Sequence, residues 1–250
     1  MSGDASTDDL DRTELRRQSR RERTRAATVD EIKQTALAIM RENSTIDVRF
    51  ADIARAMGLT APALYRYFAD RDELLTAMIS DGFLDLSDCL SAAVEGIADD
   101  DIADRLVATA EAYRAWAKRD PQRFTLVFGL PVPGYTAPED GPTVDAARRA
   151  LSNLGAIVAA ASVQGVAQPP LLGEVSPRLA TALADKQLAG DSTPAATLQA
   201  MMHAWAALHG FVSLETFGHF HWYDEAARDE LFLGLVRLSA LGMGVPAPGP

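Results

Sequence analysis

The stretch Leu59–Leu75 (LTAPALYRYFADRDELL) places Tyr65, Arg66 and Tyr67 one residue after three small residues, Ala-Pro-Ala. A helix that enters the major groove of DNA needs small residues near its N-terminus, so that it can approach base edges, with hydrogen-bond donors and apolar surface just behind them. Tyrosine and arginine provide both. The alternative is that the two tyrosines are ordinary half-buried core residues.

The contacts expected of this helix divide by the part of DNA that each side chain would reach. Thr60 would offer its hydroxyl and backbone N–H to a phosphate at the start of the helix. Tyr67 and Arg71 would flank the helix and donate to the sugar-phosphate backbone. The face opposite the apolar Leu64 and Phe68 would meet the bases, and it carries Ala61, Pro62, Tyr65 and Arg66.

The elements that must position this helix are predicted from local signals. A helix over 48–57 has its apolar residues on one face, and Gly58 follows it, where a turn requires positive φ. Thr60 can cap the next helix, which we expect to end near residue 68, and Pro62 suits its first turn. Thr-x-x-Glu from Thr28 and Asp-x-x-Glu from Asp70 are capping boxes that predict further helix starts. Residues 28–68 thus have the pattern of a helix-turn-helix.

Charge is distributed unevenly along the 250 residues. The formal net charge is −11, but residues 10–79 hold 13 Lys and Arg against 11 Asp and Glu, whereas residues 80–250 hold 11 against 21. Seven arginines fall within residues 10–25. We interpret residues 1–27 as a flexible arm whose Arg21, Arg23 and Arg25 contact phosphates or a narrow minor groove; the alternative is a solvated tail.

Composition and periodicity predict an all-α protein. We expect further helices at Ile102–Arg119, Pro121–Phe128, Val144–Ala167, Ser176–Ala189, Thr193–Gly218 and Asp224–Leu241. The sequence has no apolar run long enough to span a membrane, no signal peptide and a single cysteine, Cys89, which suits a reducing cytoplasm. Signatures of common catalytic sites are missing, so we expect no enzyme and no cofactor.

Residues 50–79 (FADIARAMGLTAPALYRYFADRDELLTAMI) resemble the DNA-binding domain of the TetR family of bacterial transcription regulators. The family's L-Y-x-[HY]-F helix end and the basic-acidic-x-L start that follows are both present, and Arg71 stands where lysine is commonest. The resemblance extends over about residues 28–80. The stretch 204–220 also resembles the WHG-type C-terminal domain of that family, through Trp205, His209 and Gly210.

The resemblance implies a three-helix helix-turn-helix DNA-binding domain followed by a larger helical domain for ligand binding and dimerisation. On this basis we expect an arm at 1–27, the DNA-binding domain at 28–72, the ligand-binding and dimerisation domain at 73–243 and a tail at 244–250. It also implies that a homodimer binds a palindromic operator, most commonly as a repressor, and that a small molecule releases the DNA.

A ligand cavity is expected to be lined by aromatic residues of the C-terminal part, with His209 as a polar anchor. The candidates are Trp116, Phe124, Phe128, Tyr135, Met202, Trp205 and His209. The alternative is that each of them simply packs in the core. A metal site is not expected, because His219 and His221, two apart on a helix, would lie on different faces and no acid or cysteine completes a set.

Dimerisation is also expected because one helix-turn-helix reads few base pairs, and because the last two long helices are apolar over much of their surface. Two other functions stay open. One is a small-molecule binding protein or enzyme that does not use its helix-turn-helix. The other is a protein that binds DNA without regard to sequence.

Overall fold

The computed structural model describes residues 5–129, 134–136, 138, 141–184 and 193–249, with the backbone alone for residues 5–18. No strand occurs in these ranges, so the expected all-α class is confirmed. The chain divides into two compact units, Met1–Met78 with Leu130–Thr136, and Ile79–Gly129 with Ala137–Pro250.

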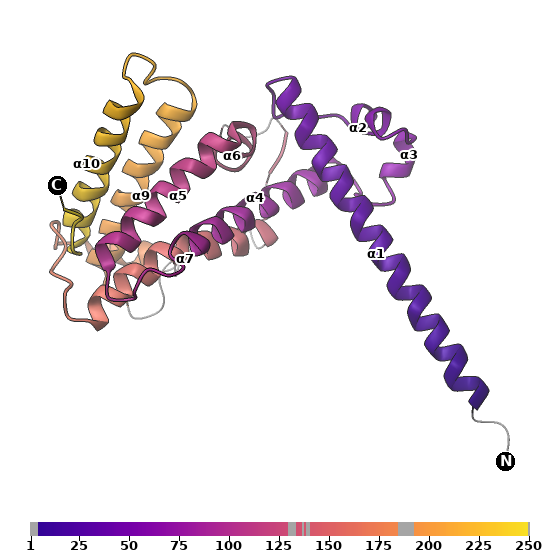
Figure 1. Ribbon diagram of the computed structural model, residues 1–250, viewed down its shortest axis with the longest axis horizontal. Helices are drawn as coiled ribbons and strands as arrows, with labels where there is room; N and C mark the ends of the chain where they lie inside the picture. Colours follow the sequence, from indigo (N-terminus) through magenta and orange to yellow (C-terminus); the bar gives the residue numbers. More distant parts are fainter. Residues whose placement is uncertain (1–4, 130–133, 137, 139–140, 185–192, 250) are drawn as a thin grey trace. The chain divides into compact units, whose positions relative to one another are not determined.

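The first unit contains α1 (Ala5–Glu42), α2 (Phe50–Ala56), α3 (Ala61–Leu64) and the start of α4 (Arg71–Ala93). The C-terminal half of α1 packs against α2, and α2 packs against α3 (Figure 1). Their apolar faces meet in a core that contains Ile32, Ala36, Met40, Ile53, Leu64, Phe68 and Leu74. The spacing of these residues is that of helix faces, which is why the core could be anticipated from the sequence.

Two expected boundaries in this unit are wrong. The first helix begins at Ala5 and not at Thr28, because arginine is a good helix former and no Gly or Pro interrupts residues 5–42. The Thr28 hydroxyl accordingly donates to the Thr24 carbonyl oxygen within the helix and caps nothing. The helix that begins at Ala61 ends at Leu64, and turns continue from there to Tyr67.

The capping box at the start of α4 is present in the structure. Asp70 accepts a hydrogen bond from the Glu73 backbone N–H at 2.8 Å, and Glu73 accepts in return from the Ala69 N–H. The two side chains satisfy donors that the first turn of a helix leaves free. They also fix where the chain turns from the helix-turn-helix into α4.

The second unit contains the rest of α4, then α5 (Ile102–Arg119), α6 (Pro121–Phe128), α7 (Pro142–Val163), α8 (Pro177–Ala184), α9 (Ala195–Thr216) and α10 (Glu225–Met243). The expected ranges of α5 and α6 are confirmed, and the last part of the helix expected at Ser176–Ala189 lies outside the described residues. α5 packs against α6, α7, α9 and α10, and α9 and α10 run side by side (Figure 1). No helix among the described residues is long and apolar enough to cross a membrane.

A buried charge cluster connects three helices of the second unit. The Arg114 guanidinium on α5 donates through Nε to Glu215 Oε2 on α9 at 2.6 Å and through Nη1 to Asp229 Oδ1 on α10 at 2.7 Å. The Glu215 side chain is only 2% exposed. Burial alone would raise the pKa of Glu215, but the hydrogen bonds from Arg114 and the charges of Arg114, Lys118 and Arg228 outweigh it, so the pKa lies below its ordinary value.

Glu215→Ala is expected to destabilise the protein by about 3–5 kcal/mol, because it leaves the Arg114 charge buried without its main partner. Urea unfolding followed by far-ultraviolet circular dichroism measures this change. Asp229→Ala is the matched control, since that side chain is 58% exposed, and its loss should cost about 1 kcal/mol or less. Equal effects of the two substitutions would contradict the assignment of Glu215 as the principal partner.

Candidate nucleic-acid interface and ligand cavity

The turn between α2 and α3 has the geometry that the sequence predicts. Gly58 has φ +65°, a left-handed conformation that glycine adopts without strain. The Leu59 N–H then donates to the Ala54 carbonyl oxygen at 2.8 Å and closes the end of α2. Thr60 is the extended residue before α3, and its side chain makes no capping hydrogen bond.

The outer surface of α3 and the turn after it is open. Thr60, Pro62, Tyr65 and Arg66 are exposed, and Ala61 is half-buried. Tyr65 is 58% exposed although its ring packs on Phe50, with 5.1 Å between the ring centroids. One side of this ring is therefore supported by the core while the other stays available to a partner, so Tyr65 is not the half-buried core residue of the alternative interpretation.

Arg25 connects α1 to the turn that follows α3. Its Nη1 donates to the Arg66 carbonyl oxygen at 2.9 Å, and its guanidinium lies 5.3 Å from the centroid of the Tyr67 ring. A guanidinium has five N–H donors, so this contact leaves others for a phosphate. Arg21 and Arg23 are exposed on α1, and Arg23 donates to the Ser19 carbonyl oxygen at 3.3 Å.

Arg71, expected to contact the DNA backbone, is engaged within the first unit. Its guanidinium donates to Asp47 Oδ1 at 2.7 Å and to the Val48 carbonyl oxygen at 3.2 Å. These bonds connect the first turn of α4 to the segment that precedes α2. No local pattern indicates them, because Asp47 lies 24 positions earlier in the chain.

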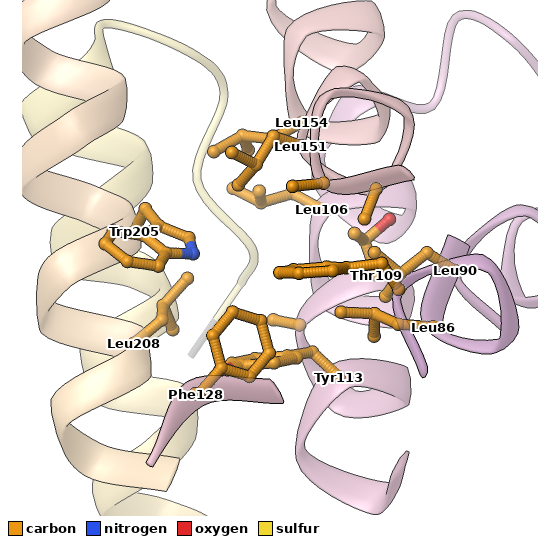
Figure 2. A pocket seen from close by; sticks show the side chains of 14 residues that line it. Leu86, Leu90, Leu106, Thr109, Tyr113, Phe128, Leu151, Leu154, Trp205 and Leu208 are labelled. Atoms are coloured by element: carbon orange, nitrogen blue, oxygen red, sulfur yellow. The ribbon is translucent and has the colours of Figure 1, made fainter. Parts of the chain in front are cut away.

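A cavity of about 350 Å³ lies inside the second unit. Figure 2 shows side chains converging on it from α4, α5, α6, α7 and α9. The volume lies in the lower part of the range common for small-molecule sites. Most of the wall is hydrocarbon, with residues such as Leu86, Leu106, Leu154 and Leu208.

His209 lies behind the aromatic end of this cavity, where it contacts the wall residues Trp205 and Tyr113. The imidazole stacks on Trp205 with 5.1 Å between centroids and an interplanar angle of 9°. Its Nδ1 lies 2.7 Å from the Tyr113 hydroxyl, and its Nε2 lies 3.4 Å from Ser213 Oγ. With the proton on Nε2, both ring nitrogens have a partner. Burial lowers the pKa of His209 and raises the pKa of Tyr113, so both groups are neutral near pH 7.

The residues expected to line a ligand site separate into three groups. Phe128 and Trp205 line the main cavity. His209 lines neither cavity, although its Nδ1 lies 2.7 Å from the hydroxyl of Tyr113, which lines the main one. Met202 lines a smaller neighbouring cavity of about 130 Å³, together with Trp205. The remaining three lie elsewhere.

Trp116, Phe124 and Tyr135 are not among the residues that line either cavity. The Trp116 ring is buried and its Nε1 donates to Asp85 Oδ2 at 2.7 Å, while Phe124 is buried in the core beside Phe128. Tyr135 belongs to the first unit, where its hydroxyl lies 3.0 Å from that of Thr76. Aromatic character alone does not distinguish core from cavity wall.

None of the α5 residues that line the cavity is among the residues expected on sequence grounds. Leu106, Ala110 and Tyr113 line the cavity at the spacing i, i+4, i+7, which is one face of a helix. That spacing is visible in the sequence. It does not indicate a cavity, because a helix face that lines a cavity and one that packs against another helix have the same pattern.

Two family models match this chain. One, described as "Bacterial regulatory proteins, tetR family", matches residues 26–78, and the other, described as "Tetracyclin repressor-like, C-terminal domain", matches residues 106–238, more than half of the chain. The chain belongs to the TetR family. Its first match contains the α2–α3 helix-turn-helix, and its second contains Trp205, His209 and Gly210.

Individual proteins are similar to this chain in sequence or in structure. The HTH-type transcriptional regulator Rv1816 of Mycobacterium tuberculosis is 35% identical over 170 residues, which is 67% of this chain and 71% of that protein. The crystal structure of SCO4313 is 32% identical with a TM-score of 0.69, covering 87% of this chain and 97% of the other. PfmR, a TetR-family regulator from Thermus thermophilus, shares the fold with 18% identity and a TM-score of 0.52, over 88% and 97% of the two chains.

This TetR-family chain is therefore a DNA-binding transcriptional regulator, as are the curated relatives by their names. The helix-turn-helix belongs to the part of the chain that the family uses for DNA. Among the described side chains, no three of His, Cys, Asp and Glu gather as a metal ion would require.

The burial of His209 predicts a pH dependence of stability. A histidine whose pKa is depressed by folding contributes stability that is present above its unfolded value, about 6.5, and is lost as the pH falls through the folded value. The free energy of unfolding should thus fall less steeply from about pH 7 to about pH 5 in His209→Gln than in the parent.

Denaturant unfolding at a series of pH values measures this slope. Glutamine can still accept a hydrogen bond from Tyr113, so the substitution removes the titration and keeps a partner for that hydroxyl. The control is His203→Gln, because His203 is exposed on the same helix. If the His209 variant keeps the slope of the parent, the neutral buried imidazole is not the source of the effect.

Proposed function

We propose that this protein is a repressor that works in the bacterial cytoplasm, binds a palindromic operator as a homodimer and leaves the DNA when a small molecule enters the second unit. The observation that carries the proposal is the pairing of an exposed α3 surface with an apolar cavity in one chain. In this mechanism, ligand binding favours a state of the dimer in which the two α3 segments no longer match the half-sites.

The reading of bases is assigned to the surface of Ala61, Pro62, Tyr65 and Arg66. Small residues at the start of α3 allow close approach to the groove, and the exposed face of Tyr65 can pack on a thymine methyl group or on sugar. Thr60, Tyr67 and the arginines of α1 are assigned to phosphates. Arg71 is assigned mainly to holding the segment before α2, since Asp47 already pairs with it.

A homodimer is supported by the outer faces of α9 and α10. Leu231, Leu238 and Leu241 of α10 are 47%, 61% and 62% exposed, and their spacing of seven and three residues puts them on one stripe. Leu214 near the end of α9 and Phe217 directly after it are 44% and 49% exposed, three residues apart. Gly210 and Gly234 have open space where a side chain would be, which lets helices of a second copy approach closely.

The deciding experiment is a footprint of the purified protein on the DNA upstream of its own gene, at fixed salt, with and without an extract of cellular small molecules. The proposal requires a protected palindrome that the extract releases. Salt-sensitive binding without a protected site would favour the sequence-independent alternative. No DNA binding would favour a small-molecule binding protein or enzyme that does not use its helix-turn-helix.

Tyr65→Ala is expected to lower the ratio of operator to non-operator affinity by about tenfold to a hundredfold, since a good base contact contributes about 1–3 kcal/mol. Non-specific binding should remain, because the arginines are intact. Fluorescence anisotropy with both DNAs measures the ratio. Tyr65→Phe keeps the packing on Phe50 and tests the hydroxyl separately, and Tyr223→Ala, 43% exposed in the second unit, is the control. An unchanged ratio in Tyr65→Ala would mean that this ring does not read the operator.

Leu238→Asp is expected to produce monomers, because two buried carboxylates at a two-fold contact repel one another. Sedimentation velocity at micromolar concentration should show half the mass of the parent. Operator affinity should fall by about a thousandfold or more, toward the non-specific level. The control is Val163→Asp, which changes a residue that is 89% exposed at the end of α7. A dimeric Leu238→Asp variant would place the interface elsewhere.

A further inference from the structure

The wall of the main cavity carries no formal charge. Of the described side chains that line it, none belongs to Asp, Glu, Lys, Arg or His, and the polar ones are Thr109, Tyr113 and Trp205. Transfer of an ion from water to such surroundings costs several kcal/mol unless an opposite charge compensates it. The cavity is therefore unsuited to carboxylates, phosphates and ammonium groups.

The three polar side chains differ in what they can offer. The Tyr113 hydroxyl is already within 2.7 Å of His209 Nδ1. The Thr109 hydroxyl is buried and makes no hydrogen bond to the described residues. In Figure 2 the indole edge of Trp205 that carries Nε1 is turned toward the side chains on the opposite wall. An indole N–H can only donate, so the partner that fits it is an acceptor.

The cavity also has room for extension past Trp205. Leu151, Leu154 and Trp205 line both the main cavity and the smaller one of about 130 Å³, so these three side chains separate two adjoining spaces. Met201 and Met202 form part of the second space. Methionine side chains adapt readily to the shape of what they contact. A molecule that occupies both spaces would therefore be elongated and would pass along the Trp205 side chain.

We propose that the effector of this protein is an uncharged, elongated and mainly hydrocarbon molecule with one hydrogen-bond acceptor that binds the Trp205 N–H. This rests on the proposed function, in which a small molecule occupying the second unit releases the operator. Besides the indole, the Thr109 hydroxyl is the polar group of the wall that has no hydrogen bond to the described residues. A hydroxyl is the simplest ligand group that can accept from the indole N–H and also donate to another oxygen.

The test compares three ligands that share a ten-carbon chain and differ in the charge of the head group: decan-1-ol, decanoate and decylammonium. Binding to the full-length protein without DNA is measured by isothermal titration calorimetry at pH 7.5, below micelle-forming concentrations. Decan-1-ol should bind at least tenfold more tightly than either ion. Equal or tighter binding of decanoate or decylammonium would overturn the assignment of an uncharged ligand.

Two substitutions locate the binding. Ala150→Trp fills the cavity from α7 and should weaken binding of decan-1-ol by more than tenfold, whereas Ala159→Trp on the exposed side of the same helix should leave it unchanged.

Trp205→Phe keeps an aromatic ring and removes the donor. It should weaken decan-1-ol by about threefold to tenfold, the effect of one hydrogen bond, and leave butylbenzene, which has no acceptor, within twofold.

The second comparison stays decisive even if Ala150→Trp does not fold, because butylbenzene, which has no acceptor, reports any effect of the smaller phenyl ring on the shape of the cavity. Unchanged decan-1-ol affinity in Trp205→Phe would overturn the role of the N–H. Failure of the ligand assignment is distinguishable from failure of the proposed function, because the operator footprint is measured separately. If neither decan-1-ol nor butylbenzene binds while the operator is still protected, the assignment of an uncharged ligand is wrong and the proposed regulator is unaffected. If decan-1-ol binds without releasing the operator, the ligand site is supported and the proposed release mechanism is contradicted.

Discussion

The packing of the second unit depends on the ion pair between Arg114 and Glu215, which is buried among its helices. Arg114 on α5 is held by Glu215 on α9 and Asp229 on α10, and its guanidinium also lies 4.9 Å from the Phe232 ring centroid. Such a pair is strongly directional, because a guanidinium fork binds a carboxylate in one geometry. It therefore favours one register of α5 against α9, which apolar packing alone specifies less sharply.

This register has consequences on both sides of the helices. The inner faces of α5 and α9 supply Leu106, Tyr113, Trp205 and Leu208 to the cavity. The outer faces of α9 and α10 carry the leucines assigned to the dimer contact. Because α9 carries part of the cavity wall and part of the proposed interface, a ligand that displaces α9 would also act on the surface where two copies would meet. This gives a physical route for coupling without any additional element.

The first unit is organised by shorter-range constraints. A left-handed glycine reverses the chain between α2 and α3, and the Asp70–Glu73 capping box begins α4. Arg25 and Arg71 then connect each side of the helix-turn-helix to its neighbours through carbonyl oxygens and Asp47. Both arginines thus help to hold the surface of α3 and the turn after it in shape. Arg25 keeps N–H donors for a further partner, and Arg21 and Arg23 are exposed on the same helix.

Features that depend on neighbours a few positions apart could be predicted from the amino-acid sequence alone. Helix faces, the Gly58 turn, the Asp70 cap and the ranges of α5 and α6 follow from periodicity and from backbone preferences, which act locally. The expected start of α1 is wrong because Thr28 and Glu31 form a valid cap pattern that an uninterrupted helix overrides. Three features became clear only from the tertiary structure. These are which aromatic side chains line a cavity rather than the core, which arginines are paired within the protein, and the buried contact of Glu215 with Arg114. These outcomes depend on residues up to about a hundred positions apart meeting at a particular distance, and no local pattern encodes that distance.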